Sequence, residues 1–237
     1  MIKIGGLQKN TLIDFPGCVA ATVFLCGCNF RCPWCYSREI VLPEEIKKQP
    51  EISEKKFFDF LEKRQSLLEG VVICGGEPTM NQDLPVFIKK IKKMGFFVKL
   101  DTNGSNPAML KRLIGARLIN YVAMDVKLPK EKYRKNVVMS ECWNDKMLNN
   151  IQKSIDILKK GKVDYEFRTT VVPTVHTEED IIEIAKWLNG SKRYFLQNFR
   201  PEKTIDPAFT KIKPYPENYL LEIKKEVSPF FETCQIR

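Results

Sequence analysis

The sequence lacks any long hydrophobic run. No stretch approaches the roughly 18 apolar residues that a membrane-spanning helix needs. The first residues also lack the apolar segment of a signal peptide. With 43% hydrophobic and 29% charged residues, the chain can still bury one sizeable core and is not disordered by composition. We therefore expect a cytoplasmic protein with no membrane partner.

Linkers and low-complexity stretches are missing as well. The 237 residues are therefore predicted to form a single domain, with a core over about 18–200 and a C-terminal wrap and helix over 201–237. Lysine and arginine outnumber aspartate and glutamate by 39 to 29. Aromatic residues are not interleaved with the basic ones, as they are in many RNA-binding surfaces. The net charge of +10 thus indicates solvated helix faces or an acidic protein partner rather than nucleic acid.

Histidine is scarce, with His176 the only one, whereas cysteine occurs eight times. Cys28, Cys32 and Cys35 form a C-x-x-x-C-x-x-C motif in a stretch whose Gly, Asn and Pro residues allow it to bend. Three thiolates this close together can converge on one soft metal centre. If that centre is a four-iron cluster, one iron stays open to a non-protein ligand. The alternative is a structural zinc site completed by Cys26 or His176. The remaining cysteines are interpreted mostly as core or incidental thiols: Cys18, Cys26, Cys74, Cys142 and Cys234.

Apolar segments alternate with segments of helical periodicity along most of the chain. Short apolar runs predict six strands, at 18–25, 71–74, 96–100, 121–124, 165–172 and 194–199. Helices are predicted over 53–69, 84–94, 107–114, 147–158 and 177–188, with a last one over 217–226. This alternation predicts parallel strands joined by right-handed crossovers. The choice lies between an open doubly wound sheet and a barrel. Six units in this length favour an α/β fold that is a partial, laterally open (β/α)6 TIM-like barrel.

Polar motifs follow four consecutive predicted strands. The cysteine motif follows the first, 75–79 (Gly-Gly-Glu-Pro-Thr) the second, 101–104 (Asp-Thr-Asn-Gly) the third, and 125–127 (Asp-Val-Lys) the fourth. Glycines let a ligand approach the backbone, and Glu77 offers a carboxylate to an ammonium group. By themselves, the motifs at 75–79 and 101–104 are each typical of a turn. Because the carboxyl ends of barrel strands share one face, we expect the four motifs to form one site.

Together these motifs resemble the signature of the radical S-adenosylmethionine (SAM) enzymes. In that signature an aromatic residue, here Trp34, precedes the last cysteine, and a Gly-Gly-Glu-Pro follows the second strand. More narrowly, residues 6–17, 27–33 and 124–129 are similar to segments of the proteins that activate anaerobic ribonucleoside-triphosphate reductase by forming a glycyl radical. The resemblance covers residues 2 to about 200.

The resemblance implies a [4Fe-4S] cluster on Cys28, Cys32 and Cys35, with SAM chelating the fourth iron. Glu77 would contact the SAM amino group, and a monovalent cation would sit among the polar residues of the site. An electron from a flavodoxin- or ferredoxin-type donor would cleave SAM to methionine and a 5'-deoxyadenosyl radical. That radical would take a hydrogen atom from a glycine of the partner reductase. The residues implied to bind SAM are Trp34, Gly75, Gly76, Glu77, Asp101, Thr102, Asp125 and Lys127.

Two other functions stay open. One is radical SAM modification of a small molecule, as by a 7-carboxy-7-deazaguanine synthase, which shares the small size and the Gly-Gly-Glu motif. The other is a zinc or iron–sulfur binding module without catalysis. The residues at 26–28 and 35–37 depart from the Gln-Gly-Cys and Cys-His-Asn of the family, which leaves the identity of the substrate open.

Some polar residues are not assigned by the motifs. Several activases have a histidine near the end of the sixth strand, where this chain has Gln197 and Asn198 as polar contacts or core residues. His176 is interpreted as a satisfied loop histidine rather than a catalytic one. Arg168 and Arg200 lie either on the anion side of the site or on the surface.

Overall fold

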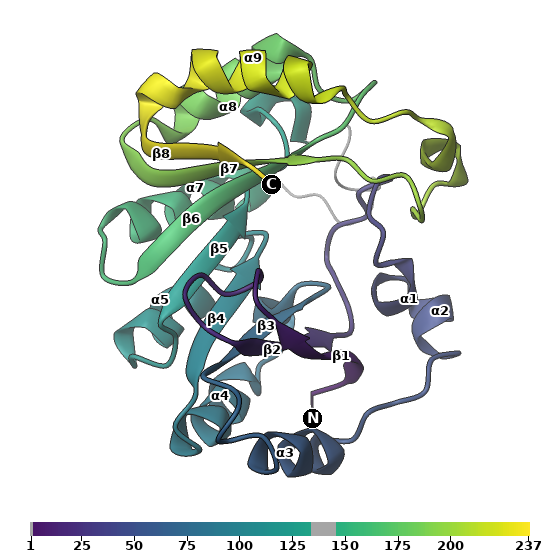
Figure 1. The fold of residues 1–237 in the computed structure, drawn as a ribbon, viewed down its shortest axis with the longest axis vertical. Coiled ribbons are helices and arrows are strands. Elements are labelled where there is room, and N and C mark those ends of the chain that lie inside the picture. The colour runs from purple at the N-terminus through teal and green to yellow at the C-terminus, as the bar shows by residue number, and fades with distance from the viewer. Residues whose placement is uncertain (1, 134–145) are drawn as a thin grey trace.

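The computed structural model describes residues 2–133 and 146–237, and within them the chain forms one sheet of eight strands (Figure 1). Each strand pairs with its neighbours in the sequence. The first pair is antiparallel and all later pairs are parallel. The strands are β1 (Ile4–Thr11), β2 (Ala20–Leu25), β3 (Gly70–Gly75), β4 (Phe97–Thr102), β5 (Tyr121–Asp125), β6 (Asp164–Val171), β7 (Ser191–Asn198) and β8 (Phe231–Ile236).

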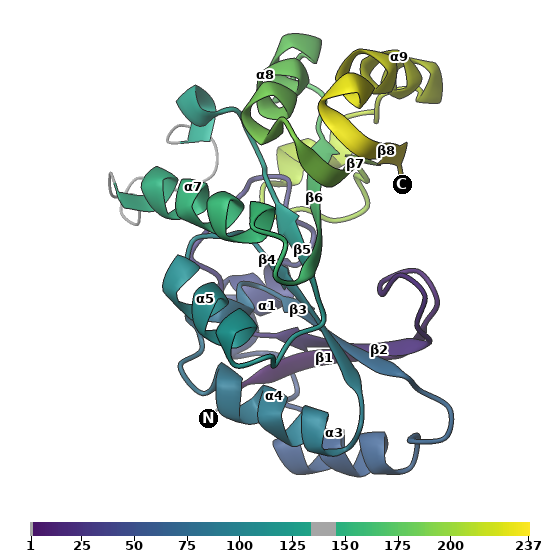
Figure 2. The same cartoon turned by 90° about the vertical axis from the view of Figure 1, so that its left-hand side faces the viewer.

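Helices cover the outer face of the curved sheet, and two short ones follow the cysteine motif on the other side (Figures 1 and 2). The short helices are α1 (Arg38–Val41) and α2 (Pro43–Ile46). The outer helices are α3 (Glu54–Glu62), α4 (Leu84–Lys93), α5 (Pro107–Gly115), α7 (Lys146–Lys159), α8 (Glu178–Leu188) and α9 (Glu217–Val227). Among the residues described, no helix is both long enough and apolar enough to span a bilayer.

The predicted open barrel is confirmed, and the six predicted strands correspond to β2 through β7. The sheet has two further strands that the apolar runs did not indicate. The segment of β1 contains two glycines and a polar Gln-Lys-Asn run, and β8 (Phe-Glu-Thr-Cys-Gln-Ile) has no continuous apolar run. The helix predicted over 53–69 ends at Glu62. The chain turns early because the backbone N–H groups of Glu69 and Gly70 both donate to the carbonyl of Val19.

Alternate residues of the strands pack into two separate cores, because successive side chains point to opposite faces of a sheet. Val122 belongs to the large outer core beneath the helices, whereas its neighbour Tyr121 faces the lumen. Phe15, from the loop between β1 and β2, packs in the lumen with Ala20, Val72 and Tyr121. These residues close the end of the lumen that lies at the amino ends of the parallel strands.

Candidate active site

The four polar motifs meet at a cavity of about 320 Å³ at the carboxyl ends of the strands. Ten of the eleven predicted site residues line it: Cys28, Cys32, Trp34, Cys35, Gly75, Gly76, Asp101, Thr102, Asp125 and Lys127. The eleventh, Glu77, is buried just behind the wall. The structure therefore brings together residues that lie up to about a hundred positions apart in the sequence. This is expected, because the carboxyl ends of the strands of a parallel barrel lie on one face.

The close packing of the cysteine loop requires glycine at Gly75, the last residue of β3, and at Gly76, which follows it. A Cβ atom on Gly76 would lie 2.0 Å from the carbonyl oxygen of Gly27. Gly75 has a φ of +119°, and a Cβ there would lie 2.4 Å from the backbone of Leu25. The backbone N–H of Glu77 donates to the same Gly27 carbonyl at 2.8 Å. The glycines thus let the end of β3 fix the start of the cysteine loop.

The C-terminal wrap fixes the other end of the cysteine loop. The backbone N–H of Ile205 donates to the carbonyl of Cys35, and that of Asp206 donates to the carbonyl of Pro33, both at 2.9 Å. Because these residues are far apart in the sequence, no local pattern could indicate the contact. The loop is therefore held at both ends by backbone hydrogen bonds.

The three thiols form a donor set that suits an iron–sulfur cluster. Burial raises the pKa of Cys28 and of Cys32 to about 12, and it also raises the pKa of Cys35. They are therefore thiols in the metal-free protein, and metal binding would release their protons. In the described part of the chain, no three His, Cys, Asp or Glu side chains are already gathered as a metal site. The thiols must turn toward one another when metal enters.

The two residues that could complete a zinc site do not line the cavity. The Sγ of Cys26 packs beside Gly5. Both ring nitrogens of His176 are engaged: Nδ1 accepts from the backbone N–H of Val172 at 3.0 Å, so Nε2 carries the proton and donates to the carbonyl of Lys127 at 2.7 Å. His176 is thus a satisfied loop histidine, as predicted. Cys142 lies outside the described residues.

Glu77 is held by the chain itself. It is 1% exposed, and its carboxylate accepts hydrogen bonds from the backbone N–H of Thr79 at 3.1 Å, the hydroxyl of Thr102 at 2.8 Å and the backbone N–H of Asn103 at 2.6 Å. Burial raises the pKa of Glu77 although these donors oppose the shift. Glu77 therefore ties the end of β3 to the end of β4. A contact between its side chain and the SAM amino group stays a prediction.

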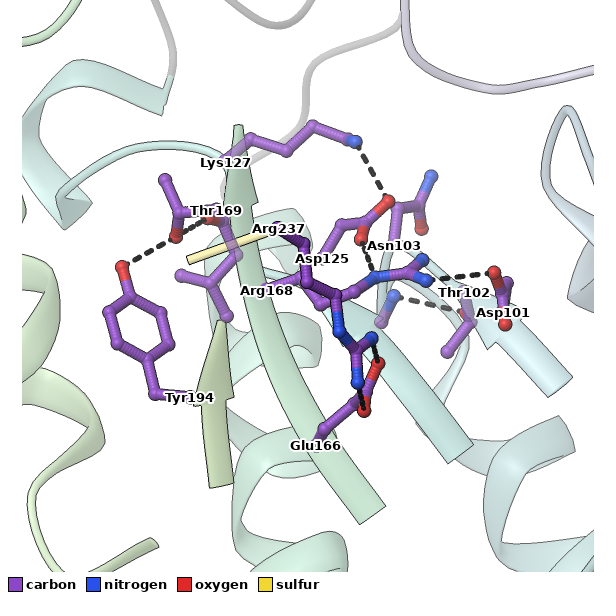
Figure 3. Close-up of polar contacts among 12 residues, drawn as sticks. Asp101, Thr102, Asn103, Asp125, Lys127, Glu166, Arg168, Thr169, Tyr194 and Arg237 are labelled. Carbon is purple, nitrogen blue, oxygen red and sulfur yellow. Dashed lines mark hydrogen bonds and ion pairs between the residues drawn. The ribbon is translucent and has the colours of Figure 1, made fainter. Parts of the chain in front are cut away.

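A chain of five alternating charges crosses the lumen, as Figure 3 shows for most of its members. The Nζ of Lys99 lies 2.6 Å from Oδ1 of Asp101, and NH1 of Arg168 lies 3.0 Å from Oδ2 of Asp101. The Nε of Arg168 donates to Oδ1 of Asp125 at 2.8 Å, and Nζ of Lys127 lies 3.3 Å from Oδ2 of Asp125. Arg168 therefore belongs to the site, where it bridges two predicted site carboxylates.

Each carboxylate oxygen of this chain already faces a cationic side chain. Burial alone would raise the pKa of Asp125, but Arg168 and Lys127 outweigh it and lower the pKa to about 2. The arrangement does not fit the monovalent cation that the resemblance implies, because no carboxylate oxygen of Asp101 or Asp125 is unpaired. Three cations against two carboxylates leave one positive charge. Lys127, at the end of this chain, pairs with one carboxylate only and lines the cavity, so it offers an ammonium group to an anion such as an amino-acid carboxylate.

The cavity wall also includes residues that the motifs did not assign. Tyr36 lines it beside the cysteines, and Gln197 reaches it from β7. Cys74, interpreted from the sequence as an incidental thiol, lines the wall from β3. Asp14 folds in from the loop after β1 and accepts from the hydroxyl of Thr22 at 2.7 Å. The remaining residues that the motifs left open lie elsewhere: Asn198 donates to the carbonyl of Tyr215, and Arg200 is exposed.

His176 gives the fold a pH dependence that can be measured. Burial lowers its pKa below the ordinary value of 6.5. Below about pH 6.5 the unfolded chain binds a proton that the folded chain resists, so this residue's contribution to stability falls as the pH falls, by at most about 1.4 kcal/mol per unit. We expect the difference in urea unfolding free energy between wild type and H176Q to shrink between pH 7 and pH 5.5. A difference that does not change with pH would contradict this.

Comparisons with known proteins agree with this geometry. A sequence profile of the radical SAM superfamily matches residues 22–188. Two proteins of Methanocaldococcus jannaschii, each provisionally named a glycyl-radical enzyme activating enzyme, are similar over most of their lengths. One is 38% identical over 236 residues, which are 99% of this chain and 95% of the relative. The other is 28% identical over 218 residues, covering 85% and 78% of the two chains.

A solved structure shares the fold. Streptococcus suis SuiB, in its complex with S-adenosylmethionine, superimposes with a TM-score of 0.65 over 89% of this chain. This chain spans about half of SuiB, 48% of its length. At 15% identity the similarity shows the architecture alone.

Proposed function

Because the chain belongs to the radical SAM superfamily, whose members use a [4Fe-4S] cluster and SAM, we propose that Cys28, Cys32 and Cys35 hold that cluster and that the enzyme cleaves SAM reductively. The observation that carries the proposal is the single cavity that these cysteines share with the strand-end motifs. Three soft thiolates are the ligand set of such clusters. When bound, the cluster supplies one electron to SAM, which gives methionine and a 5'-deoxyadenosyl radical.

The residues of the cavity would bind SAM and shield the radical. Lys127 faces the cavity with the positive charge that the charge chain leaves in excess, and it would bind the SAM carboxylate. Asp101 and Thr102 offer oxygens to the hydroxyls of the ribose. Trp34 is 5% exposed, and Phe15 closes the opposite end of the lumen. Such apolar walls would keep water and stray hydrogen donors away from the radical.

We further propose that the substrate is a glycine of a partner enzyme, an anaerobic ribonucleoside-triphosphate reductase. The radical would take the Cα hydrogen, which yields 5'-deoxyadenosine and a glycyl radical. The provisional names of the M. jannaschii relatives support the activating role, and the segments at 6–17, 27–33 and 124–129 support the reductase. The unclosed sheet, with β1 and β8 at its edges, suits a substrate that enters as a protein loop.

The proposal is tested by anaerobic reconstitution and a cleavage assay. We expect about four irons and four sulfides per chain, and release of 5'-deoxyadenosine from SAM that depends on dithionite. Stoichiometric zinc with no SAM cleavage would contradict the proposal. Adding a candidate reductase should then produce a glycyl radical, detected by electron paramagnetic resonance. SAM cleavage without that radical, but with turnover of a purine-like small molecule, would favour the alternative reaction, which resembles that of 7-carboxy-7-deazaguanine synthase.

A further inference from the structure

A strongly basic groove lies outside the barrel, between α5 and α7. The two helices pack side by side (Figure 2), and the groove between them has a volume of about 1030 Å³. All five of its basic side chains are exposed, and none forms an ion pair with another described residue. The groove also contains one carboxylate, so its net charge is +4. These residues are Lys111, Arg117, Lys153, Lys160 and Lys162, with Asp156 as the carboxylate.

The other dense basic segment, on α4, differs from this groove. There Lys90 pairs with Glu54 at 3.0 Å, and Lys92 donates to the side chain of Asn120 at 3.1 Å. The carboxylate of Glu54 offsets the charge of Lys90, and the neutral amide of Asn120 holds Lys92 in place. In the groove the cations repel one another and are stabilised only by water and counterions, so an acidic partner that displaced the counterions would gain free energy.

One end of the groove reaches the cysteine loop. Asn150, which lines the groove, donates from Nδ2 to the backbone carbonyl of Ser105 at 3.1 Å. Asn29, the residue after Cys28, donates from its Nδ2 to the hydroxyl of the same Ser105 at 2.9 Å. The Nδ2 of Asn29 also lies 3.9 Å from the sulfur of Met147 in the first turn of α7. Covalent bonds and two hydrogen bonds therefore connect the groove to the cysteine loop.

We infer that this groove is the docking surface for an acidic one-electron carrier protein, an inference that rests on the proposed function. Each SAM cleaved needs one electron, and the carrier supplies it: the carrier is oxidised by one electron, the sulfur–carbon bond of SAM breaks, and methionine and the adenosyl radical result. A carrier seated on the groove would lie outside the barrel and be connected to the cysteine loop through Asn150, Ser105 and Asn29. The cavity inside the barrel then stays free for SAM and for the substrate.

The test separates docking from chemistry by using two reductants. In the groove variant, K111E combined with K153E, one lysine on each helix is reversed. The matched control, K89E combined with K93E, changes the net charge equally on exposed lysines of α4. With reduced ferredoxin at limiting concentration and low salt, we expect SAM cleavage by the groove variant to fall by about tenfold or more. With dithionite, which needs no docking surface, both variants should match wild type.

Binding of oxidised ferredoxin to the unreconstituted protein gives a readout that does not depend on activity. Biolayer interferometry should show weaker binding to the groove variant only, and the wild-type affinity should fall as salt rises. Equal binding to both variants, or equal loss in both, would overturn the inference and leave the proposed function intact. A groove variant that cleaves SAM normally with ferredoxin but forms no glycyl radical would also overturn it, because the groove would then hold the reductase. No cleavage by wild type with dithionite would contradict the proposed function itself.

Discussion

Replacing Cys32 by alanine is expected to abolish SAM cleavage, with a loss of at least about a thousandfold. Cys32 is the middle cysteine of the motif, is 5% exposed, and lines the cavity with Cys28 and Cys35. With only two thiolates left, the loop cannot hold a four-iron cluster, so the electron that starts the reaction has no route to SAM. Iron content, the visible absorption of the cluster and dithionite-driven 5'-deoxyadenosine release measure the effect.

Cys234 provides the matched control. It lies on β8, at the edge of the sheet, and does not line the cavity. We expect C234A to retain its iron and its cleavage rate. A C32A protein that still assembled the cluster and cleaved SAM would contradict the assignment of the cluster to this motif.

Replacing Gly76 by alanine should have the second largest effect. The added methyl would lie 2.0 Å from the carbonyl oxygen of Gly27, which is backbone that cannot rotate away, so the cysteine loop must shift. A displacement of about 1 Å can cost a hundredfold in rate, and overpacking costs about 1–3 kcal/mol of stability. We expect a SAM cleavage rate about a hundredfold lower, together with reduced iron content and a lower melting temperature.

Gly115, at the end of α5, offers the same substitution without the clash. Its φ is not positive, and a Cβ there would meet no atom within 4 Å. We expect G115A to be neutral or stabilising by about 0.4–1 kcal/mol. If G76A matched G115A in dithionite-driven cleavage, the close contact between β3 and the cysteine loop would have no role in the site.

The sequence predicted the parts of the site that are encoded as short strings. The cysteine motif and the three strand-end motifs are local, and the geometry of a parallel barrel brings strand ends together whatever their sequences. The chain of alternating charges was harder to predict from the sequence, because Lys99 and Arg168 lie inside segments that were identified as strands by their apolar residues. Their positions still carried a signal: Lys99 and Asp101 are two residues apart on one strand and thus point to the same face.

Other features depend on contacts that no local pattern records. The contact of Glu77 with the SAM amino group stays a prediction, whereas the hydrogen bonds that its oxygens accept from Thr79, Thr102 and Asn103 could not be read from the glycine-rich motif. Those partners come partly from a different strand. The two outer strands, β1 and β8, are ordered by pairing with β2 and β7 rather than by hydrophobic runs of their own. Whether such segments form strands depends on the neighbouring strands with which they pair rather than on their own sequences.

The hydrogen bonds from Ile205 and Asp206 to the cysteine loop bear on the order in which the site is made during synthesis. The ribosome produces the chain from the N-terminus, so all three cysteines emerge long before the segment that holds their loop. Until residue 206 has left the ribosome, the loop is anchored at its start but not at its end. The proposed cluster site therefore has all three of its cysteines early in translation, but its loop is anchored at both ends only after residue 206 has emerged, so we expect cluster insertion to follow that point.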